Sequence, residues 1–327
     1  MRDQGAIDRR TALLAGLAIA GVSATAQART APAGTAANET ILLWPKGAPG
    51  MPATPPIEKA EERGSAAVHD RGLTGIARPR LEVFRPATPK GGAMLIMPGG
   101  GYSNVVVDKE GNEVARWLAE QGITCFVLSY RLPGEGWANP ADTPLSDAQR
   151  AMRLIRARAG QYGIDAKRVG AMGFSAGGHL CADLATRFAA KVYAPVDAAD
   201  RLSARPDAAA PIYPVISMEP GVTHAGSRAN LIGADADAAR TAAHSADRNV
   251  TAETPPCFLL HAEDDGVVPI ENILRFRAAL RAKGVVTETH LFPDGGHGFG
   301  LRQIAGKSTA PWPGLFLAWA ARVGIAG

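Results

Sequence analysis

The stretch Gly173-Phe174-Ser175-Ala176-Gly177 places a serine between two glycines, where an apolar run gives way to a helical pattern. The apolar run, residues 169–172, predicts a strand, and residues 178–188 predict the helix that follows. Glycine has no Cβ, so the two glycines permit a very tight turn that leaves the serine hydroxyl at the top of a sheet. This pattern is typical of a nucleophile elbow. Since the motif alone is weak, the rest of the chain must supply an acid, a histidine and an oxyanion hole.

The composition is that of a globular protein with a sizeable core: 327 residues, 46% hydrophobic and 20% charged. The net charge of +4 is small and no basic run with interleaved aromatics occurs, so we expect no nucleic-acid partner. Cys125, Cys181 and Cys257 lie in apolar segments without metal-ligand spacing. This favours small buried side chains over a metal site or a disulfide framework, while one disulfide among the three stays open.

Residues 1–28 predict an export signal. Arg9-Arg10 precede a modestly apolar stretch, residues 11–24, and Ala26-Gln27-Ala28 provides a small-x-small cleavage pattern. The stretch is too short and too rich in small polar residues to span a membrane. The paired arginines favour bacterial Tat export, with ordinary Sec export as the alternative. We therefore expect a periplasmic or secreted protein without a membrane span, whose mature chain begins near Arg29.

Two regions follow the signal. Residues 29–80 are rich in Ala, Gly and Pro with little periodicity, and we expect an extended arm over the body of the protein. From residue 81, strand patterns alternate with helical ones, so residues 81–327 predict a catalytic domain of the α/β class. Its central sheet should be mainly parallel, with helices on both faces. The predicted strands are 81–84, 92–97, 123–129, 168–172, 208–217 (broken by Pro211 and Pro214), 256–260 and 285–292. The predicted helices include 114–121, 143–159, 178–188, 270–282 and 313–323, with a mixed helical and loop insertion at 219–249.

A base and an acid follow the serine in chain order. His297 lies on a glycine-flanked loop just past a predicted strand, and it alone among seven histidines has this setting. Asp264 and Asp265 lie on the loop after the preceding strand, and chemistry alone leaves the choice between them open. The order serine, acid, histidine is one that serine hydrolases use.

An oxyanion hole needs backbone N–H groups where the chain can approach a substrate closely. Pro98-Gly99-Gly100-Gly101-Tyr102 follows the buried strand that ends at Met97, and glycines allow backbone angles that other residues avoid. We expect the donors to be the amides of Gly100, Gly101 and Ala176.

These residues resemble the α/β-hydrolase esterases of the acetyl esterase and acetylxylan esterase kind, over most of the chain after the signal. The motifs that carry the resemblance are Leu43-Trp44-Pro45, Gly47-Ala48-Pro49-Gly50, Pro98–Tyr102, Glu110-Gly111, Tyr130–Pro133, Asp147–Arg150, Gly173–Leu180, Arg205-Pro206-Asp207, Tyr213-Pro214-Val215 and the Asp265 and His297 loops. Pro98 stands where the His-Gly-Gly-Gly motif of related esterases has histidine, which leaves the glycine donors in place.

The resemblance implies an α/β-hydrolase fold and selects Asp265 as the acid, through the pattern His-Gly-x-x-Asp-x-x-Val-Pro, with Ala262 in place of the glycine. It implies a serine carboxylesterase, without metal or cofactor, that removes O-acetyl groups from a carbohydrate such as xylan or xylo-oligosaccharides. Loop position suggests substrate contacts from the insertion and from Tyr102, Asn104, Arg131 and Trp137. Trp137 fits sugar stacking or buried packing equally well.

Three alternatives stay open. A general short-chain carboxylesterase or lipase shares every motif, although the polar insertion at 219–249 does not look like an apolar lid. A peptidase of the prolyl-oligopeptidase type usually carries a propeller, for which this chain lacks room. A non-catalytic binding protein tends to lose the nucleophile or the histidine, and both are present here.

Overall fold

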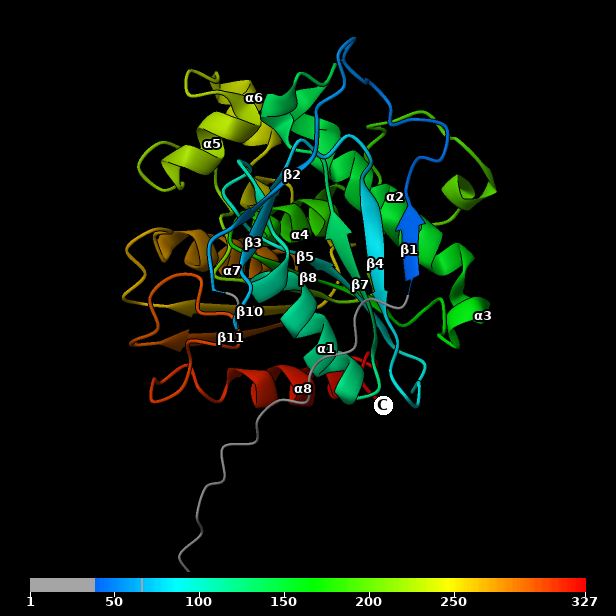
Figure 1. Cartoon of the computed structure of the whole chain (residues 1–327). Coiled ribbons are helices and arrows are strands. Elements are labelled where there is room, and N and C mark those ends of the chain that lie inside the picture. Colours follow the sequence, from blue (N-terminus) through cyan, green and yellow to red (C-terminus); the bar gives the residue numbers. More distant parts are fainter. Residues whose placement is uncertain (1–38, 66) are drawn as a thin grey trace, which may run out of the picture. The chain divides into compact units, whose positions relative to one another are not determined.

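The computed structural model describes residues 39–65 and 67–327 of the chain. An eight-stranded sheet forms its centre, with the strand order β1-β4-β7-β5-β8-β9-β10-β11 (Figure 1). The bounds are β1 (Glu39–Leu42), β4 (Arg80–Phe84), β7 (Thr124–Ser129), β5 (Ala93–Met97), β8 (Val169–Phe174), β9 (Ala209–Ile212), β10 (Cys257–Ala262) and β11 (Thr287–Phe292). The six strands from β7 to β11 in this order are parallel, and β1 and β4 pair antiparallel at one edge. The expected α/β class with a mainly parallel sheet is confirmed.

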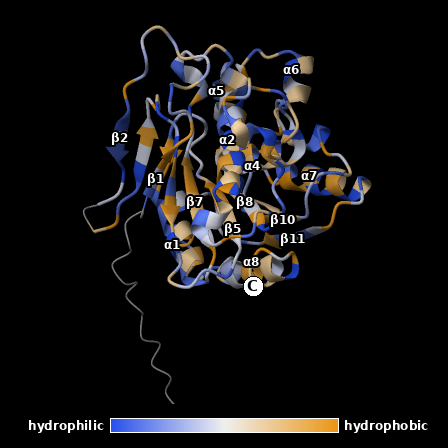
Figure 2. Ribbon diagram, turned by 90° about the vertical axis from the view of Figure 1, so that its right-hand side faces the viewer, coloured by the Kyte–Doolittle hydropathy of each residue, from blue (hydrophilic) through white to orange (hydrophobic). Residues whose placement is uncertain are grey.

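Helices cover both faces of the sheet. α1 (Glu113–Glu120) and α8 (Trp312–Arg322) cover one face, whereas α2 (Thr143–Ala157), α4 (Ala176–Arg187) and α7 (Glu271–Ala282) cover the other. Side chains of β5 alternate between the two cores, with Met94 and Ile96 facing α1 and α8, and Leu95 and Met97 facing the opposite helices. Because both faces of the central strands are covered, these strands are apolar throughout, and Figure 2 shows them in orange.

The segment expected to be an extended arm contributes strands. β1 forms one edge of the main sheet by pairing with β4. β2 (Lys59–Glu62) and β3 (Arg71–Thr74) form a separate antiparallel sheet with β6 (Val105–Val106). A turn of π-helix, Asp108–Asn112, follows β6 and leads into α1.

The strand predicted over 208–217 is shorter than expected, since β9 ends at Ile212. Tyr213 has a φ of 35°, which turns the backbone out of the extended conformation that a strand needs. The chain then passes beside the elbow, where Val215 N donates to Ser175 O over 3.2 Å. The predicted insertion contains α5 (Ala225–Ile232) and α6 (Ala238–Ala243). A short helix, α3 (Ala159–Tyr162), follows α2 in the chain.

The three cysteines are fully buried and free, so their predicted burial is confirmed. Burial in apolar surroundings raises the pKa of the Cys181 thiol to about 12. Within residues 39–65 and 67–327, we find no helix with the length and apolarity needed to cross a bilayer. The predicted export signal lies outside the described residues.

Candidate active site

The elbow at Ser175 joins β8 to α4 through a strained backbone. Ser175 has φ 54° and ψ −118°, a conformation that residues with a Cβ rarely adopt. A Cβ at Gly173 would collide with the Gly177 carbonyl, and one at Gly177 would collide with the carbonyls of Met97 and Pro98. The glycines of the motif are therefore required by close backbone approach, as the sequence indicated.

The structure brings Ser175, His297 and Asp265 together. His297 Nε2 lies 2.9 Å from Ser175 Oγ, and His297 Nδ1 lies 2.7 Å from Asp265 Oδ2. Since the carboxylate can only accept, Nδ1–H donates to Asp265 and Nε2 is the atom that accepts from the serine hydroxyl. Ser175 is 8% exposed, so it is reachable but partly enclosed.

Asp265 is held by donors on both carboxylate oxygens. Oδ1 accepts from the amides of Val267 and Val268, each over 2.9 Å. Oδ2 lies 3.2 Å from Nε2 of His261 in addition to its contact with His297. Burial opposes ionisation, but the hydrogen bonds from the two histidines and from Val268 lower the pKa of Asp265 well below its usual range.

Asp264 has a different partner, because its Oδ1 accepts from the amide of Gly296 over 2.7 Å. It supports the backbone of the histidine loop and does not contact the imidazole. Lys307 Nζ donates to the Gly295 carbonyl over 2.9 Å, which stabilises the same loop at a second point. The Tyr213 ring packs edge-on against the imidazole of His297 with centroids 5.2 Å apart.

The predicted oxyanion-hole amides are available. Gly100 and Gly101 have φ values of 124° and 62°, which confirms the need for glycine there. Over the part of the chain that the structure describes, no backbone or side-chain acceptor takes the amides of Gly100, Gly101 or Ala176. Ala176 is also the first residue of α4, so the partial positive charge of the helix N-terminus adds to its donor strength.

A buried carboxylate connects the glycine loop to the histidine loop. The sequence motifs did not identify it as a functional residue. Glu110, in the π-helical turn, is 3% exposed. Its Oε2 accepts from the Gly99 amide over 2.9 Å, and its Oε1 lies 3.0 Å from the Tyr213 hydroxyl. That hydroxyl accepts in turn from the Gly300 amide over 3.2 Å. The sequence signal was the Glu110-Gly111 motif, to which no role was assigned.

Three of the four expected substrate contacts are corrected by the structure. The Tyr102 side chain is 2% exposed and its hydroxyl lies 2.7 Å from Nδ1 of His179, which in turn bonds through Nε2 to the carbonyl of His244 over 2.8 Å. Burial lowers the pKa of His179, so this histidine supports the elbow as a neutral group. The Tyr102 side chain is consequently part of the buried support of the elbow.

Arg131 and Trp137 are also buried, at 1% and 3% exposure. The Arg131 guanidinium forms an ion pair of 2.8 Å with Asp147 and lies 4.6 Å from the centre of the Trp137 ring. Buried packing, one of the two roles considered for Trp137, is the correct one. Asn104 is partly exposed, and its Nδ2 donates to Ser103 Oγ over 3.3 Å.

Helix α5 brings residues of the insertion next to the glycine loop. Asn230 Nδ2 donates to the Gly101 carbonyl over 2.8 Å. A Cβ built on Gly101 would lie 3.8 Å from Cε1 of His224. His224 has no motif around it in the sequence, so only the fold reveals its position beside the oxyanion-hole loop.

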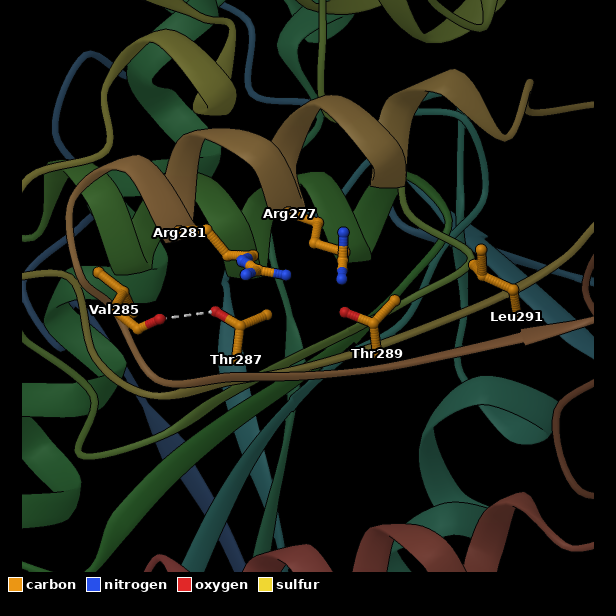
Figure 3. Close-up of a pocket in the computed structure, with 6 residues that line it drawn as sticks. All are labelled: Arg277, Arg281, Val285, Thr287, Thr289 and Leu291. Carbon is orange, nitrogen blue, oxygen red and sulfur yellow. Dashed lines mark hydrogen bonds between the residues drawn. The ribbon is translucent and has the colours of Figure 1, made fainter.

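A cavity of about 680 Å³ lies elsewhere, between α7 and β11. Figure 3 shows Arg277 and Arg281 extending from α7 toward Thr287 and Thr289 of β11. No residue of the serine, histidine and aspartate cluster lines it. We therefore place the candidate site at the elbow and not in this cavity.

Comparison with known proteins agrees with this geometry. A family model described as BD-FAE matches residues 81–280, which include Ser175 and Asp265. The chain belongs to the BD-FAE family. The resemblance to acetyl esterases and acetylxylan esterases inferred from the motifs is thereby confirmed, together with the α/β-hydrolase fold.

Three similar proteins place this BD-FAE member more closely. An acetylxylan esterase of Xylanibacter ruminicola is 34% identical over 233 residues, which are 70% of this chain and 45% of the relative. Endo-1,4-beta-xylanase B of Butyrivibrio fibrisolvens is 40% identical over 205 residues, 63% of this chain and 32% of the relative. The chain thus spans less than half of each of these two relatives. The crystal structure of an acetyl ester-xyloside bifunctional hydrolase from Caldicellulosiruptor lactoaceticus has a TM-score of 0.68 and 32% identity, covering 84% of this chain and 100% of that one.

Proposed function

We propose that this protein is a serine carboxylesterase that removes O-acetyl groups from a carbohydrate such as xylan or xylo-oligosaccharides. The observation that carries the proposal is the pair of contacts at His297, 2.9 Å to Ser175 Oγ and 2.7 Å to Asp265 Oδ2. These contacts form a nucleophile, a base and an orienting acid in the arrangement that acyl transfer requires.

In the proposed mechanism, Ser175 Oγ attacks the carbonyl carbon of the acetyl ester while its proton passes to Nε2 of His297. The amides of Gly100, Gly101 and Ala176 donate to the oxygen that becomes negatively charged. His297 then returns the proton to the departing alcohol oxygen, which leaves acetyl-Ser175. Water attacks this ester with His297 as the base, so that acetate is released and the serine hydroxyl is restored.

The acetyl and xylan parts of the proposal are supported by the relatives. One of them is named an acetylxylan esterase and another a xylanase, and the structural neighbour is described as an acetyl ester-xyloside hydrolase. These names agree with the preference that the family resemblance implied. A general short-chain esterase would use the same site, and only measurement of the substrate range distinguishes the two.

The test is acetate release by the purified protein that begins at Arg29. Acetylated xylo-oligosaccharides are compared with p-nitrophenyl acetate, butyrate and octanoate. We expect release from the oligosaccharides and a steep loss of rate beyond acetate. Turnover of octanoate without release from the sugars would replace the proposal with a general esterase or lipase.

The nucleophile is tested separately with the Ser175→Ala variant and a fluorophosphonate probe. We expect the variant to fold normally, to resist labelling and to lose about 10⁵- to 10⁶-fold in kcat. Undiminished activity would refute the catalytic assignment. The same probe also tests whether the protein is a non-catalytic binding protein. In that case the wild-type protein itself would not be labelled.

We also propose that residues 1–28 direct export, with the paired arginines as a Tat signal. Arg9→Lys together with Arg10→Lys should retain the protein in the cytoplasm. The measurement is the amount of protein in periplasmic and secreted fractions, with its N-terminus determined by mass spectrometry. Export of the double variant at the wild-type level would favour the Sec route.

A further inference from the structure

His224 lies at the start of α5, where the insertion meets the glycine loop. It precedes α5 as its N-cap and is half-buried. Its ring lies beside Gly101, whose carbonyl is held by Asn230 of the same helix. The ring is also near enough to His297 and Asp265 for their charges to affect its ionisation. His224 therefore lies beside the oxyanion-hole loop, within electrostatic range of His297 and Asp265.

The protonation of the His224 ring is fixed by its role in capping α5. Its Nδ1 accepts from the Ser227 amide over 3.2 Å and lies 2.9 Å from Ser227 Oγ. Because a backbone amide can only donate, Nδ1 carries no proton and the neutral ring bears its proton on Nε2. Burial first, and then the positive charge that His297 can carry, lower the pKa of His224, with Asp265 opposing them. The ring is thus a neutral Nε2–H donor at neutral pH.

Among the residues that the structure describes, this donor has no partner. Across residues 39–65 and 67–327, the hydrogen bonds of the His224 ring all involve Nδ1. Nε2 is not fully buried, so it is exposed to solvent and can bind a ligand. An acetyl group carries a single acceptor, the carbonyl oxygen, for which three backbone amides are available. A further donor beside them fits an oxygen atom of the alcohol part of the ester.

We propose that His224 is a specificity-determining residue whose Nε2–H donates to a hydroxyl or ring oxygen of the sugar that carries the acetyl group. This inference rests on the proposed function, and it assigns one part of that function to a named atom. p-Nitrophenyl acetate has the same acetyl group but no hydroxyl or ring oxygen in its alcohol part. The contact should therefore raise the rate for the sugar ester relative to the aryl ester.

Two variants separate this contact from the capping role. His224→Asn keeps an acceptor for the Ser227 amide, since asparagine is a good N-cap residue, but it is too short to supply the distal donor. His224→Gln places an amide N–H₂ at about the distance of Nε2. His69→Asn is the control, because it makes the same replacement at an exposed histidine whose imidazole pairs with Glu62. Circular dichroism and the thermal midpoint establish that each variant is folded.

The quantity measured is the ratio of kcat/KM for an acetylated xylo-oligosaccharide to kcat/KM for p-nitrophenyl acetate. We expect His224→Asn to lower this ratio about five- to tenfold, mainly through KM of the sugar ester, as for one lost neutral hydrogen bond. His224→Gln should recover much of it, and His69→Asn should leave it unchanged. An unchanged ratio in His224→Asn refutes the proposal.

An equal loss on both esters also refutes it, because His224 would then act on the oxyanion or on His297. Failure of the wild type to release acetate from the oligosaccharide is a separate result, which refutes the proposed function instead. The tautomer is tested independently by ¹⁵N NMR of the free protein. The spectrum should show a protonated Nε2 and an unprotonated Nδ1 for His224 at pH 7, and the opposite pattern would remove the basis of the inference.

Discussion

Asp265 shows how two adjacent carboxylates acquire different roles. Asp265 receives donors from His297, His261 and two backbone amides, whereas Asp264 receives the amide of Gly296. Each donor to Asp265 stabilises its ionised form and orients it toward the imidazole. In the proposed acyl transfer, the negative charge of Asp265 stabilises the imidazolium that forms.

The two aspartates are predicted to differ strongly in their effect on turnover. Asp265→Asn should lower kcat about 10⁴-fold, because an amide in that place no longer holds the productive imidazole tautomer. Asp264→Asn should lower it less than tenfold, since an amide oxygen can still accept from Gly296. Steady-state kinetics with p-nitrophenyl acetate measure both, and the reverse ranking would show that Asp264 is the acid.

The lowered pKa of Asp265 also determines the form of the pH profile. A carboxylate whose pKa lies below the usual range stays ionised from about pH 5 upward. A general base must be unprotonated to accept the proton of Ser175, and Asp265 adds no second protonation in this range. We expect log(kcat/KM) to fall with a slope of one as the pH decreases. A slope of two would indicate that Asp265 gains a proton in the same range.

The elements around the site are connected by Glu110. Its carboxylate joins the loop after β5 to Tyr213 at the end of β9, and the Tyr213 hydroxyl joins the loop that carries His297. The oxyanion donors and the base therefore share one buried hydrogen-bonded group. Burial makes each of these bonds costly to lose, because the partner left behind is unsatisfied.

Glu110 is accordingly predicted to be a positioning residue. Glu110→Ala should lower kcat roughly 10²-fold with a smaller change in KM, since a misplaced oxyanion donor affects the transition state most. Glu110→Gln retains an acceptor for the Gly99 amide and should recover part of the rate. Glu120→Ala, at the exposed end of α1, is the matched control. Equal losses in kcat for the Ala and Gln variants would argue against a role through the Gly99 amide.

Sequence reasoning located the elements and the reacting groups because their signals are local. Glycines around Ser175 and at positions 100 and 101 are visible in the sequence itself, although Gly177 is required by its approach to Met97 and Pro98. Arg131 is buried because it pairs with Asp147, which lies on a different element. The residues next to Arg131 in the sequence therefore do not predict its burial. His224 is likewise defined by where α5 packs. The early end of β9 depends on a turn at Tyr213 that proline patterns do not locate.

At the scale of the whole molecule, a buried ion pair attaches the N-terminal segment to the hydrolase body. Asp147 on α2 accepts from the Trp44 indole over 2.7 Å as well as from Arg131. The Arg131 guanidinium also donates to the Pro49 carbonyl over 2.7 Å. Residues 44–49 are thus held against α2 and the end of β7, which explains why the Trp44 and Arg131 motifs accompany the active-site motifs.

Removal of one partner of this pair should destabilise the protein strongly. Asp147→Ala leaves the Arg131 charge buried without a counterion and should lower the free energy of unfolding by about 3–5 kcal/mol. Replacing both residues with apolar ones of similar size, Asp147→Leu with Arg131→Met, should lower it less. Urea denaturation followed by tryptophan fluorescence measures both. A double variant less stable than Asp147→Ala would contradict this account.

The positive φ of Ser175 has an evolutionary consequence. A backbone held in a sparsely populated conformation costs of order 1–3 kcal/mol, a cost that glycine at the same position would largely avoid. Selection for thermal stability alone would therefore favour replacement of the nucleophile by glycine. Under the proposed function, selection for turnover opposes this replacement, and the strained backbone is the stability cost of keeping the nucleophile.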